Sequence, residues 1–165
     1  MKRLLSVWAL GLVAIACADE AATAKKTIQT QMDAFCAAAK VKDGTKMERA
    51  VRSAFTENAT ITPYKGKPIR LDGWILSQKS QLTMLDKIDT ISLKITSLKV
   101  SGNKGTLKSS FKLTGIVQGP KGTPPMKLQS TGVSEDSIAK VNGTWKITSS
   151  KGISSSTLVN GKILK

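Results

Sequence analysis

The sequence predicts an α+β fold in which a curved antiparallel sheet packs against about three N-terminal helices. Apolar residues recur at helical spacing through the first half of the chain, and beyond Asp89 they alternate with polar residues. Near the end of the chain, Asn142-Gly143 joins two alternating runs, which is the strongest short-range signal for a β-hairpin. Helices gathered before a sheet favour an arrangement with the helices against one of its faces.

The composition indicates one domain and excludes several kinds of chemistry. The chain has 165 residues, of which 40% are hydrophobic, enough for one ordinary core. It has no histidine, which excludes histidine-dependent catalytic triads and the usual zinc sites, so we expect neither a metal nor a cofactor. Lys and Arg number 26 against 11 Asp and Glu, a formal charge of +15, but with only 4% aromatic residues we do not expect nucleic-acid binding.

Residues 1–18 are predicted to be a signal peptide. Met1 to Arg3 is basic, Leu4 to Ile15 is apolar but too short to span a bilayer comfortably, and Ala14-Ile15-Ala16 is an Ala-x-Ala cleavage pattern. We therefore expect an exported protein, in the periplasm or cell envelope or secreted, with no transmembrane span in the mature chain.

Cys17 follows the cleavage pattern directly and is a candidate for lipidation. Ala14 to Cys17 resembles a bacterial lipobox, although that family usually has Leu where this chain has Ala14. Ordinary cleavage after Ala16 or Ala18 is the alternative, and both interpretations stay open. Cys36 falls on the apolar face of a predicted helix, so we expect it to behave as a small buried hydrophobe.

The first half of the mature chain predicts three helices and two short strands. Residues 19–26 are small and polar and predict a flexible lead-in, and a first helix runs from Thr27 to about residue 43. A second helix begins at Thr45, which can cap it with Glu48 three residues on. Residues 59–64 predict a short strand with a partner at 69–71, and Asp72 is placed to cap a third helix over 73–87.

The second half predicts a meander of long strands. The first strand begins at Ile91 and changes phase near Thr96-Ser97, which predicts a bulge, and a second strand follows over 107–113. A Gly/Pro-rich loop over 118–125 precedes a strand that runs from Met126 toward the hairpin, where Trp145 is expected to anchor the core. Residues 154–165 form either a small terminal hairpin at Asn160-Gly161 or a flexible tail.

These elements carry a family resemblance. The phrases at 55–61, 63–66 and 141–147, together with Trp74, look like the nuclear transport factor 2-like superfamily, which includes SnoaL-like and ketosteroid-isomerase-like domains. The resemblance covers roughly residues 27–150 of a domain placed at 27–153, and it departs from the family's usual phrase at Asn58, where Asp is common. It implies a conical, cystatin-like α+β barrel that encloses a pocket, and it leaves the chemistry open because the same fold serves enzymes, binding domains and assembly domains.

Large aromatic side chains are the candidates for lining such a pocket, although all of them could equally be ordinary core residues. The candidates are Phe55, Tyr64, Trp74, Phe111 and Trp145.

An enzymatic site would need a base and a hydrogen-bond donor on one substrate atom. Tyr64 could donate, Asp72 could act as base and Arg70 could hold an anionic group; the plainer interpretation is a packed ring, a helix cap and a solvated cation. Glu135 and Asp136 are adjacent in a late strand, so one can reach the pocket while the other points away. The catalytic residues stay unknown at this stage.

Four lysines alternate with apolar neighbours and are expected on the sheet face away from the core. They are Lys94, Lys108, Lys112 and Lys146. They predict either a solvated face or a surface for anionic envelope polymers, lipids or glycans.

We therefore expect a non-enzymatic protein, a monomer or a homodimer, that binds a small apolar ligand or serves the envelope as an accessory protein. An isomerase, cyclase or dehydratase is the alternative, and binding of anionic polymers through the lysines is the second alternative. An enzyme requires a carboxylate inside the pocket with a raised pKa, whereas a binding protein does not.

Overall fold

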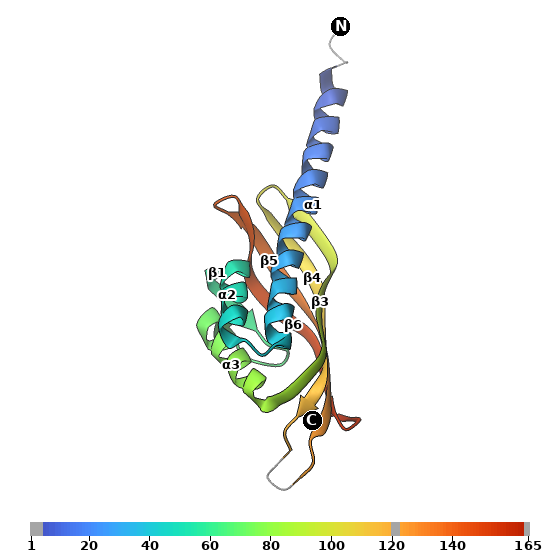
Figure 1. Ribbon diagram of the computed structural model, residues 1–165. Helices are drawn as coiled ribbons and strands as arrows, with labels where there is room; N and C mark the ends of the chain where they lie inside the picture. Colours follow the sequence, from blue (N-terminus) through green and yellow to red (C-terminus); the bar gives the residue numbers. More distant parts are fainter. Residues whose placement is uncertain (1–4, 120–122, 164–165) are drawn as a thin grey trace.

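The computed structural model describes residues 5–119 and 123–163, with side chains from residue 19 onward. Three helices and seven strands make up this part of the chain (Figure 1). In chain order they are α1 (Leu5–Lys40), α2 (Gly44–Ala54), β1 (Phe55–Thr62), β2 (Ile69–Arg70), α3 (Leu71–Met84), β3 (Leu85–Ser101), β4 (Lys104–Val117), β5 (Met126–Val141), β6 (Thr144–Val159) and β7 (Lys162–Ile163).

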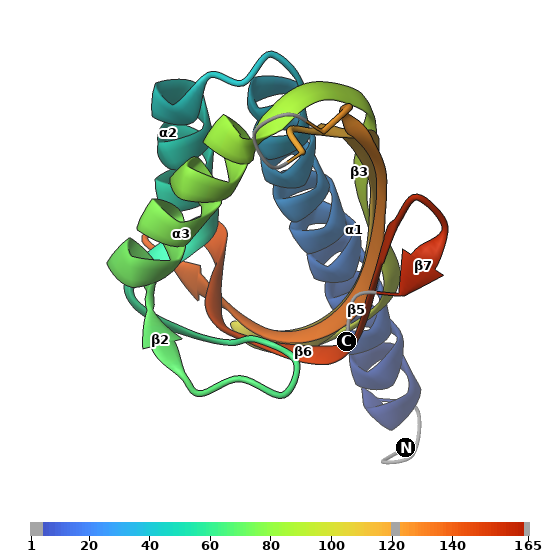
Figure 2. The same cartoon turned by 90° about the horizontal axis from the view of Figure 1, so that it is seen from below.

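The strands form one open, curved sheet in the order β2-β1-β6-β5-β4-β3, with β7 paired to β6. Seen along its axis, the sheet curves around α1, and α2 and α3 lie along the remaining side (Figure 2). The α+β prediction is confirmed, but the sheet is mixed, because β1 pairs with β6 in parallel. Alternation in a sequence shows which residues share a face of a strand, but it does not show which distant strand lies alongside. The sequence therefore did not predict the parallel pairing of β1 with β6.

Helix α1 is longer than the sequence predicted. The expected flexible lead-in at 19–26 is wrong, because these residues belong to α1 and Ala24, like Ile28 one turn later, has no exposed surface. Small side chains here let the helix pack closely against the sheet. The predicted export signal and the Cys17 side chain lie outside the described side chains, and both stay predictions. No helix in the described part of the chain is long and apolar enough to cross a membrane.

Two predicted helix caps are placed differently. Helix α2 begins one residue before Thr45, and Asp43 caps it by accepting a hydrogen bond of 2.9 Å from the Lys46 backbone N–H. Helix α3 begins at Leu71, so Asp72 lies inside its first turn and makes an ion pair of 2.9 Å with Arg52 of α2. A carboxylate in the first turn still favours the positive end of the helix, but it caps no backbone group.

The predicted bend and hairpins are confirmed. The pairing of β3 with β4 shifts register between Ile95 and Ser97, as the change of phase predicted. Asn142 and Gly143 join β5 to β6 with φ of 49° and 80°, as a type I′ turn requires. Asn160-Gly161 likewise turns β6 into β7, so the end of the chain forms the small terminal hairpin as far as Ile163.

The core sits between α1 and the sheet. Trp145 is 1% exposed and packs with Ala24, Ile28, Leu107 and Ile138, so its expected role as a core anchor is confirmed. A second group of buried side chains joins α1, α2 and α3 to the start of β3. Between these two groups the helices and the sheet leave a hollow.

Candidate functional site

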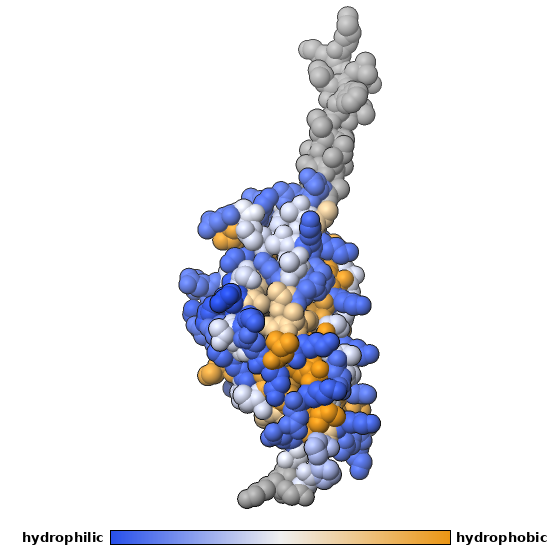
Figure 3. Space-filling view, viewed as in Figure 1, coloured by the Kyte–Doolittle hydropathy of each residue, from blue (hydrophilic) through white to orange (hydrophobic). Residues whose placement is uncertain are grey.

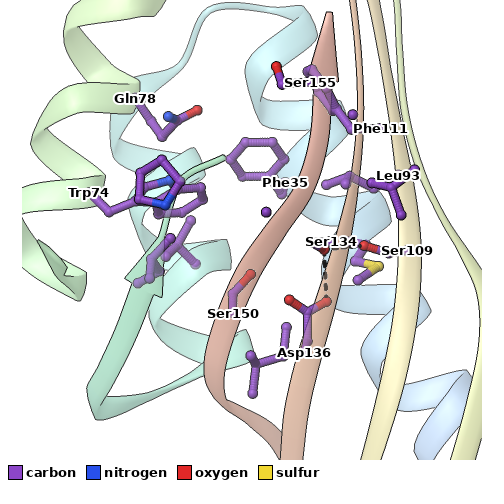
Figure 4. A pocket seen from close by; sticks show the side chains of 18 of the residues that line it. Phe35, Trp74, Gln78, Leu93, Ser109, Phe111, Ser134, Asp136, Ser150 and Ser155 are labelled. Atoms are coloured by element: carbon purple, nitrogen blue, oxygen red, sulfur yellow. Dashed lines mark hydrogen bonds between the residues drawn. The ribbon is translucent and has the colours of Figure 1, made fainter. Parts of the chain in front are cut away.

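The hollow is a cavity of about 340 Å³ between the helices and the concave face of the sheet. All three helices contribute side chains to it, as do β1 and β3 to β6. A volume of this size is typical of a small-molecule site. The close-up in Figure 4 shows side chains from the two sides pointing toward one another across the space.

The helix side of the cavity is aromatic. The ring of Trp74 on α3 stacks on Phe35 of α1, with centroids 6.3 Å apart and planes 24° from parallel. Phe55, at the start of β1, also contacts the Trp74 ring, with centroids 5.8 Å apart and planes at 40°. These three rings support one another and present a rigid apolar wall to the cavity.

The sheet side is polar and is built around Asp136. The side chains of Ser109, Ser134, Asp136 and Ser150 project from β4, β5 and β6 into the cavity (Figure 4). The hydroxyls of Ser109 and Ser134 are hydrogen-bonded at 2.9 Å, and Ser134 donates to Asp136 Oδ2 at 3.1 Å. The hydroxyls therefore hold one carboxylate oxygen in place.

The second carboxylate oxygen has no such partner. Asp136 is 3% exposed, and its Oδ1 makes no hydrogen bond to any described residue. Burial raises the pKa of Asp136 above its ordinary value. The Ser150 hydroxyl, which lies near the carboxylate without a hydrogen bond to Oδ1, and the hydrogen-bonded Ser134 counter part of that rise. A buried, unpartnered carboxylate oxygen in the wall of a cavity calls for a partner inside that cavity.

Strand register decides which of the two adjacent acids enters the cavity. Glu135 lies opposite Lys108 on β4 and forms an ion pair of 3.5 Å with it outside the sheet. Asp136, one residue on, lies opposite Leu107 and Ser150, which face inward. The sequence analysis left this choice open, although period-two alternation places Asp136 on the same face as the apolar Ile138.

Four of the five predicted pocket residues line this cavity. They are Phe55, Tyr64, Trp74 and Phe111. Trp145 does not, because α1 covers it within the core near the β5–β6 hairpin. Sequence reasoning missed the serine hydroxyls, although period-two alternation places Ser109 on the same face as the apolar Leu107 and Phe111.

The predicted catalytic grouping of Tyr64, Arg70 and Asp72 does not assemble. Tyr64 is 41% exposed at the edge of the cavity, whereas Arg70 and Asp72 do not line it. Arg70 donates a hydrogen bond of 3.3 Å to Asn58, and Asp72 pairs with Arg52. The carboxylate in the cavity is thus Asp136 and not Asp72.

Three of the four predicted surface lysines gather on the outer face of the sheet. Lys94 lies opposite Ser110, which sits between Lys108 and Lys112 on the neighbouring strand. Lys146 lies apart on β6, where its Nζ donates to the backbone carbonyl of Arg52 at 3.5 Å. The charge of Lys108 is countered by Glu135, so this face is less basic than the sequence predicted.

Neither a metal nor a reactive thiol is evident in the described chain. No three acidic or cysteine side chains there lie close enough to hold a metal ion. Burial, as the main cause, raises the pKa of the Cys36 thiol to about 11, which keeps it protonated at neutral pH. Cys36 is a free thiol among the described residues, half-buried as expected for a small hydrophobe.

Comparison with known proteins shows similarity of structure and not of sequence. No protein-family model matches the chain, and no curated protein matches it by sequence. A protein from Kribbella flavida superposes with a TM-score of 0.61 at 14% identity, over 82% of this chain and 94% of that one.

Two further solved structures carry family descriptions. A nuclear transport factor 2-like superfamily protein from Salmonella enterica serovar Typhimurium has a TM-score of 0.57 at 15% identity, over 79% of this chain and 90% of its own. A protein assigned provisionally as a scytalone dehydratase, from Novosphingobium aromaticivorans, has a TM-score of 0.54 at 15% identity, over 79% and 84%. Similarity at this level of identity shows the fold alone. The chain thus has the nuclear transport factor 2-like fold.

Proposed function

We propose that this protein binds a small, largely apolar molecule in the cavity and holds one polar group of that molecule at Asp136. The observation that carries the proposal is the buried Asp136 Oδ1, which faces the cavity without a hydrogen-bond partner. A ligand hydroxyl that donates to this oxygen would satisfy it. When the carboxyl is protonated it would itself donate, to a ligand carbonyl or hydroxyl.

The lining of the cavity supports an uncharged ligand. The chain has 26 Lys and Arg residues, yet none of them lines the cavity in the described structure. An anionic group would therefore meet no cation there, and it would face the carboxylate of Asp136. The rings of Phe35, Trp74 and Phe55 instead offer apolar contact to a flat or compact hydrocarbon body.

A matched pair of probes tests this proposal. Naphthalene and 2-naphthol share one apolar body, and only 2-naphthol carries a hydroxyl. We expect wild-type protein to bind 2-naphthol about tenfold or more tightly than naphthalene, because a hydrogen bond to a charged group contributes about 1.5–3 kcal/mol. Chemical-shift titration of the Trp74 indole would give both dissociation constants.

The variants separate the two halves of the proposal. Asp136→Ala should bind both probes with equal affinity, and Trp74→Ala should weaken both together. Glu135→Gln, on the opposite face of the same strand, is the matched control and should bind like wild type. Failure of either probe to bind wild-type protein, or an unchanged preference in Asp136→Ala, would contradict the proposal.

A second candidate function is proton transfer by Asp136. The observation that favours it is a carboxylate with a raised pKa inside the cavity, which is the feature that distinguishes an enzyme from a simple binding protein. Such a group can remove a proton from carbon beside a ketone and return it. Exchange of the α-protons of 2-tetralone in heavy water, followed by NMR, should be faster with wild-type protein than with Asp136→Asn. Equal exchange rates would leave binding as the function.

The place of action is proposed to be outside the cytoplasm. The support is the order of basic, apolar and small residues over residues 1–18. Intact mass of the protein purified from its own cells would show whether the chain starts at Met1, at Cys17 with or without an acyl chain, or at Asp19. A chain that retains Met1 in full would contradict export by cleavage.

A further inference from the structure

One end of the molecule combines two hairpins with the exit of α1. The turns between β3 and β4 and between β5 and β6 lie at the same end of the sheet, where α1 extends beyond it (Figure 1). A backbone hydrogen bond of 2.9 Å from Lys140 N–H to the Asn103 carbonyl joins the two hairpins. We call residues 19–26, 99–107 and 138–146 the hairpin end.

The hairpin end is strongly basic. Its two hairpin segments contain lysines and no carboxylate, and its helical segment adds two lysines against Asp19 and Glu20. The space-filling view shows mostly hydrophilic residues at this end, next to the projecting helix (Figure 3). The six lysines are Lys25, Lys26, Lys99, Lys104, Lys140 and Lys146.

Four of these charges stay available to a partner. Lys25, Lys26, Lys99 and Lys104 are exposed, and no ion pair to any of them is found in the described structure. Lys140 is already taken, because its Nζ lies 2.6 Å from Glu20 Oε1. That pairing lowers the pKa of Glu20, so the glutamate stays ionised and bound to β5.

The Glu20–Lys140 contact also fixes the direction in which α1 leaves the domain. Below it, Ala24 and Ile28 are fully buried against the sheet, so the helix cannot swing about this point. Above it, the helix continues without a break toward the apolar run of Leu4 to Ile15, which is shorter than the roughly 20 residues needed to span a bilayer. An apolar run that precedes a basic surface along the chain is suited to the interface of a membrane.

We propose that the hairpin end rests on a membrane surface of anionic lipid headgroups, with α1 directed into the headgroup layer. Charge complementarity identifies the partner: exposed lysines around an apolar helix match phosphate headgroups above hydrocarbon. This surface differs from the outer sheet face, where Glu135 counters Lys108. A chain that begins at an acylated Cys17 would lack the apolar run, and its acyl chain would enter the membrane at the same hairpin end.

Vesicle binding of the full-length protein tests this orientation. Wild-type protein should bind vesicles of phosphatidylcholine mixed with phosphatidylglycerol more tightly than vesicles of phosphatidylcholine alone, and added salt should reduce the difference. Neutralising two lysines with Lys99→Gln and Lys104→Gln should weaken binding to the anionic vesicles about 30-fold, from about fivefold per lysine near such a surface. The side chains of Lys99 and Lys104 are exposed, so folding should be unaffected.

The control removes the same charge from the opposite end of the sheet. Lys127 lies near the turn between β4 and β5, and Lys162 lies in β7 next to the turn from β6. The double variant Lys127→Gln/Lys162→Gln should bind anionic vesicles within about twofold of wild type. Equal loss in both double variants would overturn the proposal, because net charge and not the hairpin end would then govern binding. Equal binding of wild-type protein to the two kinds of vesicle would overturn it as well.

Discussion

Replacing Asp136 by Asn should stabilise the protein at neutral pH. The side chain is 3% exposed, Oδ1 is unpartnered and no cation lines the cavity, so the folded state carries an uncompensated charge. Leaving a buried acceptor unsatisfied costs about 1–3 kcal/mol, and somewhat more when it is charged. Asn keeps the shape of the side chain and still leaves a polar group without a partner, but it removes the charge, which costs more to bury than a neutral amide. We therefore expect Asp136→Asn to raise the free energy of unfolding by about 2 kcal/mol, or about 4–8 °C in Tm.

The pH dependence provides a stricter form of this prediction. Because burial raises the pKa of Asp136 in the folded state, the folded protein binds this proton more readily than the unfolded chain. Wild type therefore loses stability as pH rises from the ordinary pKa of an aspartate, about 3.9, through the higher folded-state value, and stays at the lower level above it. The advantage of Asp136→Asn should disappear near pH ~4 and grow as pH rises through the folded-state pKa of Asp136.

Urea unfolding of both proteins across this pH range would measure the difference. Glu135→Gln is the control: its side chain is exposed and paired only with Lys108, so its unfolding free energy should differ from wild type by less than about 1 kcal/mol. An Asn variant less stable than wild type at neutral pH, or an advantage independent of pH, would refute the account of Asp136 as an uncompensated buried charge.

Three further predictions concern the scaffold. The Gln29 side chain donates to the Leu93 carbonyl at 2.8 Å and accepts from the Ile95 N–H at 3.2 Å, so it stands in for a neighbouring strand at the edge of β3. Gln29→Ala should cost about 1–3 kcal/mol in urea unfolding and speed hydrogen exchange at Ile95; unchanged exchange would contradict this role. Trp145→Ala should cost about 3–5 kcal/mol, since it empties a fully packed site, and a loss below about 1 kcal/mol would place Trp145 outside the core. Cys36 should react with iodoacetamide at neutral pH roughly 100-fold more slowly than a thiol of ordinary pKa, and a fast reaction would show that the thiol is accessible and ionised.

The parts of the fold that the sequence predicted well are those set by neighbouring residues. Asn142-Gly143 needs no distant partner to form its turn, because both residues accept positive φ. The bulge between Ile95 and Ser97 was likewise visible as a change in the phase of alternation. Such features depend on local backbone geometry, and they were confirmed.

The parts that failed depend on contacts between distant segments. The parallel pairing of β1 with β6 brings Phe55 beside Ile147. No residue near either of them in the sequence indicates that the two strands pair. The lead-in at 19–26 looked flexible because its side chains are small, yet small side chains are what allow α1 to approach the sheet. Trp145 and Trp74 are both aromatic and both apolar, and only packing decides that one fills the core while the other faces the cavity.

For the candidate site, the sequence predicted aromatic side chains that line the cavity but did not predict the polar group around Asp136. Phe55, Trp74 and Phe111 were identified because large aromatic side chains on the predicted helices and strands must pack in the core or line a cavity. The sequence did not decide whether Asp136 or Glu135 enters the cavity, because adjacent side chains in a strand point to opposite faces of the sheet. The inward position of Ile138 two residues later was the available clue.

The contact between Glu20 and Lys140 has a consequence for the order of folding. It joins residues 120 positions apart, and the core around it likewise places Ala24 and Ile28 of α1 against Ile138 and Trp145. Contacts this distant in sequence form late, because the intervening chain must first be closed into a loop. The end of α1 near Glu20 therefore completes its contacts only when nearly the last strand exists, whereas Ala38 and Ala39 at its other end pack against α2, α3 and the start of β3, which are made earlier. A partly made chain therefore lacks the contacts that hold the Glu20 end of α1, although the rest of the helix can already pack.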